Sequence, residues 1–570
     1  MKIKLSILIS VFLFFTSIAL LTAGGARAAS RQPGLGDDEY YELMFLRDYD
    51  VAEREQNADK SVFRNYVKEK FNIGWREIHF AGDMQERLML DLAGGNYPDI
   101  INPRYTNVLK AYAEAGALLN LGELLEKYGP NVLKRHAERL PVWKAMSGTN
   151  DGNIWVMTMW QPDLVGARSL PELQWLIRSD ILEQQGYPQI LDENDLYEVL
   201  RRGLADNPTT NGRPTVAFSQ PLNSWGTNGL QCITYTYNMG RSSHMTFNRG
   251  TVFDFDANEF IDVTLDHSYR NGLEFFNRLW RNGLYDRDAV TDGWDEFEAK
   301  MREGRALAAF FYVWPWNYDF NPNLQLNNAP YRYVPFAMQL SSQRERKETM
   351  IYPQSAGEVW SSIAITKNAK NPERIAKLLN WQASDEGMIL AGWGREGVEY
   401  TIVNGRRVPT EEYFYRTEND PNYGYELYAP SEFGFYLGVD NNGQSFRITN
   451  DAYVTNRTLD PIVKNVWAQY GWTSSYDMYF QNKNFVMDTN HQIDLKAAVP
   501  TLTPELHRNW EIIDADTHDF TMRLITAASP EAFNQIFKDM LARRAELGQG
   551  EIVRLWNAEY KEMRRFYGLD

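Results

Sequence analysis

A helix followed by a strand can be recognised in DMQERLMLDLAGGNYPDIIN (Asp83–Asn102). Leu88 and Leu92 are four residues apart, which places both on one face of a helix. The pair of glycines after Leu92 ends this helix, and a turn then leads into a short apolar strand that begins at Asp99. The stretch therefore predicts a helix that packs beside a strand.

The preceding sequence adds a strand and a helix. YYELMFL (Tyr40–Leu46) is a short apolar run typical of a buried strand, and SVFRNYVKEKFN (Ser61–Asn72) has apolar residues at helical spacing. Alternation of strands with helices predicts an α/β sheet. The segments that follow two of these strands, Arg47–Asp50 and Asn102–Asn107, should lie at the carboxyl edge of that sheet, where ligands usually bind.

Later segments also have clear boundaries. Asn371 is a helix cap, and Pro372 suits the first helical position. The dipeptide Asn404-Gly405, between short apolar and aromatic flanks, predicts a hairpin turn. Near the end, two amphipathic helices are predicted in SPEAFNQIFKDMLARRAELG (Ser529–Gly548) and EIVRLWNAEYKEMRRFYG (Glu551–Gly568).

Length and charge limit the class of protein. The chain has 570 residues, 44% of them hydrophobic, which predicts two or more lobes with substantial cores. Its formal net charge is -16 at pH 7, and no block of consecutive Lys or Arg occurs after the N-terminus. Long-range attraction to a phosphate backbone is therefore weak, and no nucleic-acid partner is expected.

The N-terminus has the features of an export signal. Lys2 and Lys4 precede an apolar run, and the sequence Ala-Arg-Ala that ends at Ala28 has the small-x-small pattern of a cleavage site. We expect residues 1–28 to be a cleaved signal peptide; the alternative is an uncleaved membrane anchor. No cysteine stands near this region, so a lipid-modified N-terminus is not expected.

The rest of the chain predicts a soluble protein outside the cytoplasm: secreted, periplasmic, or held at the membrane by an uncleaved signal. No later segment approaches about 20 consecutive apolar residues. The only cysteine, Cys232, allows no intramolecular disulfide, so stability must come from packing. We interpret Cys232 as a small buried residue and not as a nucleophile.

Several blocks resemble, in their order, the extracellular solute-binding proteins of bacterial ABC importers, the sugar- and oligosaccharide-binding group. LMLDLAGGNYPDII (Leu88–Ile101) is similar to the family's helix-Gly-x-x-Pro-Asp-strand element, and DGNIWVMTM (Asp151–Met159) is similar to its hinge-crossing strand. LIRSDILEQQGYP (Leu176–Pro188) is similar to its Ile-Arg-x-Asp-Trp-Leu motif, with Ile181 in place of the tryptophan. Arg178 and Asp180 match that motif and are interpreted as structural.

Three more blocks follow in the family's order: DEFEAKMREGRALAAFFYVWPWNY (Asp295–Tyr318), IAITKNAKNPERIAKLLNWQASDEG (Ile363–Gly387) and WGREGVEYT (Trp393–Thr401). The resemblance implies a two-lobed periplasmic-binding-protein fold of type II, an α/β fold with the ligand cleft between the lobes. Lobe 1 is expected at 38–160 and 360–475, and lobe 2 at 161–359 and 476–570.

The function that the resemblance implies is that of a monomeric, non-enzymatic receptor. It would bind an oligosaccharide or another small solute, close its lobes by a hinge motion, and deliver the solute to the membrane permease subunits of an ABC importer. No cofactor is implied.

Tryptophans are the first candidates for ligand contact, because a sugar presents apolar C–H faces that stack on flat rings. In the family the tryptophan that follows the proline of the Gly-Pro-Trp element stacks on a sugar, and Trp316 is the matching residue. Each candidate could equally be a core residue, as most of the 17 tryptophans must be. The further candidates fall at expected element ends: Trp314, Trp225, Trp160, Trp360 and Trp393.

Polar candidates for the sugar hydroxyls lie on the two strand-end segments. They are Asp48, Tyr49, Arg104 and Tyr105, and each could instead be a solvated loop residue with local hydrogen bonds.

Some members of this family carry a calcium loop, and the matching stretch here is NPTTNGRPTV (Asn207–Val216). Of the family's pattern only Asn211-Gly212 is retained, and Thr209, Thr215 and Val216 stand where carboxylates are needed. Calcium requires several hard oxygen ligands, preferably charged. No high-affinity calcium site, and no other metal site, is expected.

Two rival classes share this composition: a secreted glycoside hydrolase or lyase, and a carbohydrate-binding protein without a transporter. An enzyme would need a pair of carboxylates across a cleft, and 75 acidic residues leave this open. However, no Gly-x-Ser-x-Gly, His-Glu-x-x-His or phosphate loop occurs. The order of the blocks disfavours a rigid binding module, which has no need of a hinge.

Overall fold

The computed structural model describes residues 39–47, 52–80, 83–103, 105–149, 151–158, 173–222, 250–255, 257–312, 316–353, 362–429, 438–473, 477–478, 485–488, 500, 502–566 and 568. The predicted signal peptide, Cys232 and several candidate site residues lie outside them. These candidates are Asp48, Tyr49, Arg104, Trp160, Trp225, Trp314 and Trp360.

The first sheet has five strands in the order β2-β1-β3-β14-β4. β1 pairs in parallel with β2 and β3, whereas β14 is antiparallel to both β3 and β4. The predicted strands at Tyr40 and Asp99 are thus confirmed with small shifts. The strands are β1 (Tyr41–Arg47), β2 (Ile73–His79), β3 (Ile100–Ile101), β4 (Met157–Thr158) and β14 (Ser362–Ile365).

Local capping explains where the first helices begin and end. Ser61 caps α2 (Val62–Phe71) by accepting a hydrogen bond from the backbone of Arg64. Asp83 caps α3 (Met84–Gly94), and Gly95 ends it in the left-handed conformation at φ 66°. The helix stop predicted from the glycine pair is therefore confirmed. The other helices of this lobe are α1 (Ala52–Gln56), α4 (Thr106–Glu114), α5 (Leu121–Tyr128), α6 (Pro130–Arg135), α7 (Leu140–Ala145), α16 (Pro372–Gln382) and α17 (Asp385–Trp393).

The second sheet has four strands in the order β12-β5-β11-β8. β5 runs antiparallel to β11 and β12, and β11 runs parallel to β8. Its strands are β5 (Leu173–Arg178), β8 (Val216–Ser219), β11 (Ala306–Tyr312) and β12 (Tyr333–Phe336), and its helices are α8 (Ser179–Gln184), α9 (Glu193–Asp206), α11 (His267–Arg281), α12 (Trp294–Arg302), α14 (Asn321–Leu326), α15 (Ser341–Glu345) and α21 (Pro461–Gln469).

A small third unit follows α17. Its hairpin joins β15 (Tyr400–Val403) to β16 (Arg406–Pro409) through Asn404 and Gly405, both with positive φ, which confirms the predicted turn. A separate apolar cluster around Trp393 and Phe414 holds this unit together. Its helices are α18 (Glu411–Asn419), α19 (Tyr423–Glu426) and α20 (Ala452–Thr458).

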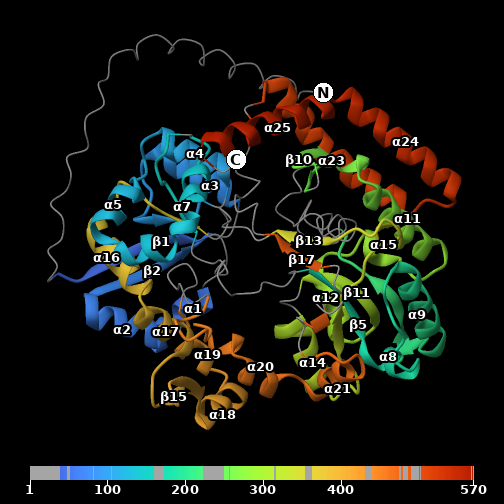
Figure 1. The fold of residues 1–570 in the computed structure, drawn as a ribbon, viewed down its shortest axis with the longest axis horizontal. Coiled ribbons are helices and arrows are strands. Elements are labelled where there is room, and N and C mark those ends of the chain that lie inside the picture. Colours follow the sequence, from blue (N-terminus) through green and yellow to red (C-terminus); the bar gives the residue numbers. More distant parts are fainter. Residues whose placement is uncertain are drawn as a thin grey trace, which may run out of the picture.

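Each sheet has its own apolar core. In Figure 1 the two lobes lie side by side, with the C-terminal helices along one end of the molecule and the third unit along the other. These helices are α23 (Pro504–Ile525), α24 (Pro530–Glu546) and α25 (Gln549–Phe566), so the two predicted C-terminal helices are confirmed. Three further strand pairs belong to the fold: β6 (Thr209–Thr210) with β7 (Arg213–Pro214), β9 (Thr251–Asp254) with β10 (Glu259–Asp262), and β13 (Met350–Pro353) with β17 (Phe485–Asp488).

Two segments pack differently from the predicted lobe ranges. α21 contributes Val463 and Trp467 to the second core, although the range 360–475 was expected in lobe 1. α25 contributes Ile552 and Trp556 to the first core, although 476–570 was expected in lobe 2. The remaining lobe boundaries stay a prediction.

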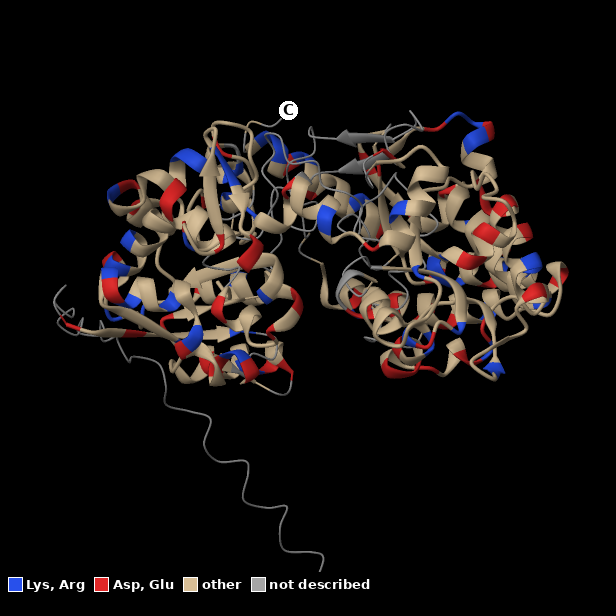
Figure 2. Ribbon diagram, turned by 90° about the horizontal axis from the view of Figure 1, so that it is seen from below, with Lys and Arg blue, Asp and Glu red and all other residues tan. Residues whose placement is uncertain are grey.

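Basic and acidic residues are interspersed along the ribbons of both lobes (Figure 2). Within the part of the chain that the structure describes, none of the helices combines the length and apolar character that a bilayer crossing needs.

Candidate functional site

One edge of the first sheet gathers the strand ends next to four candidate residues. Ile101 at the end of β3 lies beside Leu46 of β1 and Ala364 of β14. Ser362, which begins β14, lies opposite Thr158, which ends β4. The chain positions that carry Asp48, Arg104, Trp160 and Trp360 are therefore one to three residues from strand ends that meet at this edge.

The same edge is braced by buried polar contacts. Asn102 donates a hydrogen bond to the backbone oxygen of Ser362 at 2.6 Å, which ties the end of β3 to the start of β14. Arg47 pairs with Glu77 of β2 at 3.0 Å, and Arg64 of α2 lies 3.3 Å from the same carboxylate. Because Arg47 and Glu77 are almost fully buried, this ion cluster holds the end of β1 rigidly in place.

One edge of the second sheet gathers the remaining tryptophan segments. Tyr312 at the end of β11 lies opposite Leu173 at the start of β5, and Ser219 at the end of β8 lies beside Ala309. Trp314 comes two residues after Tyr312, and Trp225 follows the β8 segment. The strands that precede both chain segments end at this edge of the sheet.

The two sheet edges are linked directly through the sequence. Thr158 leaves the first edge and Leu173 enters the second, so residues 159–172 connect them. Ligands of α/β proteins bind at the edge where strands end. A site that uses both edges would thus take residues from both lobes.

Trp316 is positioned as a core residue and not as an open platform. It begins a π-helical turn (Trp316–Phe320), only 6% of it is exposed, and its indole N–H donates to the backbone oxygen of Tyr333 at 2.6 Å. It belongs to the second apolar core. Its predicted role as the main stacking residue receives no support from this burial.

Trp393 is buried in this structure, so its predicted role as a site residue receives no support and stays a prediction. It is 1% exposed, donates to the backbone oxygen of Ser445 at 2.8 Å, and lies 5.0 Å below the guanidinium carbon of Arg407. The sequence predicted it at the end of an element, and it is the last residue of α17. The apolar residues that bury it come from residues 400–454.

Tyr105 is the one polar candidate that the structure describes. It immediately precedes α4 and packs, partly buried, against the first core. Tyr105 comes soon after the end of β3 in the chain, which is consistent with a contact between its side chain and a ligand at this edge.

An aromatic group that sequence reasoning missed lies at the same edge of the second sheet. Phe336, which ends β12, packs edge-on against Tyr470 and Trp472 at ring distances of 5.2 and 5.4 Å. The signal was present in the sequence as Tyr-Gly-Trp directly after a helix, but the packing partner on β12 lies more than 130 positions away.

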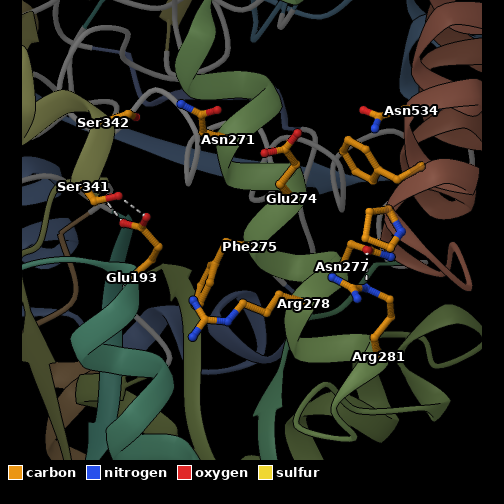
Figure 3. A pocket seen from close by; sticks show the side chains of 12 residues that line it. Glu193, Asn271, Glu274, Phe275, Asn277, Arg278, Arg281, Ser341, Ser342 and Asn534 are labelled. Carbon is orange, nitrogen blue, oxygen red and sulfur yellow. Dashed lines mark hydrogen bonds between the residues drawn. The ribbon is translucent and has the colours of Figure 1, made fainter.

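Two cavities occur among the described residues. The first, of about 490 Å³, lies in the second lobe between α11, α24 and the starts of α9 and α15 (Figure 3). In it Glu193 accepts hydrogen bonds from Ser341, and Arg281 donates to Asn277. The second, of about 570 Å³, lies between α2, α17 and the Arg395–Tyr400 segment. Neither is lined by a residue predicted to bind ligand.

The stretch that matches the calcium loop forms a hairpin between β6 (Thr209–Thr210) and β7 (Arg213–Pro214). Arg213 forms an ion pair with Glu303 at 2.7 Å, and Thr210 accepts a hydrogen bond from Arg178 at 3.0 Å. Two cationic side chains thus take positions around the loop, which opposes binding of a divalent cation. In the residues that the structure describes, no group of three His, Cys, Asp or Glu side chains could hold a metal.

Similar folds occur among solute-binding proteins of known structure. FusA of Streptococcus pneumoniae in complex with kestose matches with a TM-score of 0.64 at 15% identity, over 92% of this chain and 99% of that chain. An HMO-binding solute-binding protein associated with an ABC transporter of Bifidobacterium longum infantis matches with a TM-score of 0.64 at 14% identity, over 94% and 99%. The alginate-binding protein AlgQ2 without calcium ion matches with a TM-score of 0.62 at 17% identity, over 92% and 98%. The fold is therefore that of the two-lobed periplasmic-type solute-binding proteins.

Sequence comparison gives the family. The bacterial extracellular solute-binding protein model matches residues 57–389, more than half of the chain, and the protein belongs to this family. It is also 24% identical, over 403 residues, to the fructooligosaccharide ABC transporter substrate-binding protein FusA of Streptococcus pneumoniae, which covers 68% of this chain and 71% of that protein. The family consists of non-catalytic components of ABC transporters, so the hydrolase or lyase alternative is not supported.

Proposed function

We propose that this protein captures an oligosaccharide outside the cytoplasm and delivers it to the permease of an ABC importer. The observation that carries the proposal is the pair of sheet edges, one in each lobe, to which the candidate aromatic and polar segments attach. Relatives of the same fold were solved with kestose or named for binding HMO and alginate, which supports an oligosaccharide as the ligand class.

Binding would combine stacking with hydrogen bonds. Trp314 and Trp225, which follow strands of the second sheet in the sequence, would provide rings for the apolar faces of sugars. Asp48, Tyr49 and Arg104, next to the edge of the first sheet, provide partners for hydroxyl groups. Trp160 and Trp360 stand on segments next to the first edge, so they could contact a ligand held between the lobes.

Closure follows from a site divided between two lobes. A ligand that contacts both edges is bound more tightly when the lobes approach, so binding shifts the population toward the closed form. The permease would recognise this closed form. We propose an extracytoplasmic location for this step, with the exact compartment set by the fate of residues 1–28.

The proposal is tested by isothermal titration of residues 29–570 with neutral fructo-oligosaccharides and acidic alginate oligosaccharides of two to five units. A cleft receptor for oligosaccharides should show micromolar or tighter binding in one series, with affinity that rises with length and then levels off. No heat of binding with any member of either series would contradict this choice of ligand class.

A further inference from the structure

α21 lies alongside β12. The last residues of α21 therefore lie at the edge of the second sheet that faces the proposed ligand site. Asp460 caps the start of α21 and forms an ion pair at 2.6 Å with Arg332. Arg332 is the residue just before β12. A nine-residue helix and a four-residue strand each span about 13 Å. The residue that ends β12, Phe336, is correspondingly in contact with Tyr470, which follows the last residue of α21.

The edge reached in this way is the one already described. β12 runs antiparallel to β5, with Phe336 opposite Trp175, and β5 runs antiparallel to β11, with Trp175 opposite Phe310. The ends of β12 and β11 therefore point the same way. Trp472, beside Phe336, is placed at the edge from which the segment of Trp314 departs.

Tyr470 and Trp472 form a fixed aromatic stack at this position. Their rings are 4.8 Å apart and inclined by only 19°. Gly471 between them has φ 73°, which turns the chain so that the backbone N–H of Trp472 bonds the Trp467 oxygen at 2.9 Å. The Tyr470 hydroxyl donates to the backbone oxygen of Pro188 at 3.0 Å, so the backing ring is held from behind.

Trp472 is the outer member of this stack. It is partly exposed, and within the described residues its ring contacts only the rings of Tyr470 and Phe336. One face of the Trp472 indole therefore stacks on Tyr470, and the ring of Phe336 contacts it edge-on. A ring fixed in place by two others loses little conformational entropy on binding, which suits a stacking platform.

We infer that Trp472 stacks on one sugar ring of the bound oligosaccharide, with Tyr470 as its backing. The inference rests on the proposed function and adds a contact that the tryptophan-proline element does not provide. The second lobe then offers a stacking face from residues 470–472, whereas Trp316 is buried in its core.

Trp280 provides a matched control. It is also a partly buried tryptophan of the second lobe, but the guanidinium carbon of Arg287 lies 4.1 Å from its ring centroid. It stands near the end of α11, before the segment in which Tyr285 pairs in parallel with Phe218, and so it belongs to the opposite edge of the sheet.

The test compares W472A, W472L, W472F and W280A by isothermal titration with the tightest oligosaccharide of the wild type. We expect W472A and W472L to bind about 5- to 50-fold more weakly and W472F to recover most of the affinity, because phenylalanine keeps a flat ring. W280A should bind as the wild type does. W472L retains apolar packing on Tyr470, so it remains informative if W472A folds poorly.

Two outcomes overturn the inference in different ways. If the wild type binds and W472L matches W280A in affinity, the platform is elsewhere while the proposed function stands. If the wild type binds no oligosaccharide of the panel, the proposed function fails and this inference fails with it.

Discussion

Arg544 of α24 donates a hydrogen bond to the hydroxyl of Thr517 of α23 at 3.1 Å, at the level where both helices pass from one apolar core to the other. In α23, Ile513 belongs to the first core and Phe520 to the second. Arg544 itself is only 4% exposed. In α24, Met540, which precedes Arg544, belongs to the second core, and Leu547, which follows the helix, belongs to the first. This buried contact therefore joins two of the elements that connect the lobes.

Gly250 should tolerate no side chain at this junction. A Cβ there would lie 2.3 Å from Nη1 of Arg544, and φ is 89°. G250A should lower the free energy of unfolding by about 2–3 kcal/mol, from strain plus the clash. G212A, also at positive φ but with open space around it, should cost only about 1 kcal/mol. Equal melting temperatures for the two variants would show that Arg544 is not held against Gly250.

Trp316 should contribute mainly to stability. W316A removes a buried indole from the second core and leaves the Tyr333 oxygen with one fewer donor, which should cost about 3–5 kcal/mol. A thermal melt with a near-UV circular dichroism control would detect it. A variant that melts as the wild type does but loses sugar binding would instead restore Trp316 as the platform.

His136 should make stability fall in mild acid. Burial, and to a smaller extent the charges of Arg139 and Arg135, hold the pKa of His136 well below its ordinary value. The unfolded chain takes up this proton at about pH 6.5 and the folded protein does not, so stability is lost as pH falls below that value, by up to about 1.4 kcal/mol per pH unit.

H136F keeps a ring against Trp143 and should flatten the melting-temperature profile between about pH 6.5 and 5, where most carboxylates remain ionised. H507Q, at an exposed histidine of α23, is the control and should retain the wild-type slope. An unchanged slope in H136F would refute the assignment.

Calcium should not stabilise the protein. The hairpin at Thr209–Pro214 has Thr209 where a carboxylate is needed, and the ion pair of Arg213 with Glu303 occupies that nearby acid. After treatment with a chelator, addition of calcium to about 1 mM, a level at which extracellular calcium modules bind, should leave the melting temperature unchanged. A rise of several degrees would reveal a site.

The elements whose signals are local could be predicted from sequence. The cap at Asn371, the turn at Asn404-Gly405 and the helix stop before Gly95 each depend on residues within a few positions, and the structure confirms all three. The strands at Tyr40 and Asp99 and two helices between them were likewise predicted, because hydrophobic period and glycine positions are local properties of the sequence. β2 (Ile73–His79), which lies between those helices, was not predicted.

The partner of each element could not be predicted in the same way. Trp316 and Trp472 look alike in sequence. Only their partners distinguish them: Trp316 is a core ring that donates to the backbone oxygen of Tyr333, and Trp472 is a partly exposed ring that packs on Phe336. For the same reason α21 and α25 were expected in the wrong lobes, since amphipathicity indicates a buried face but not the core that covers it.

The most direct test of the account is a thermal-shift screen of residues 29–570 against oligosaccharides, with each sugar chromatographed afterwards. A ligand at about 100 times its dissociation constant adds about 2.7 kcal/mol to stability, which is enough to raise the melting temperature measurably. The account predicts a rise with at least one oligosaccharide, which is recovered intact. Conversion of that sugar to shorter products would contradict it.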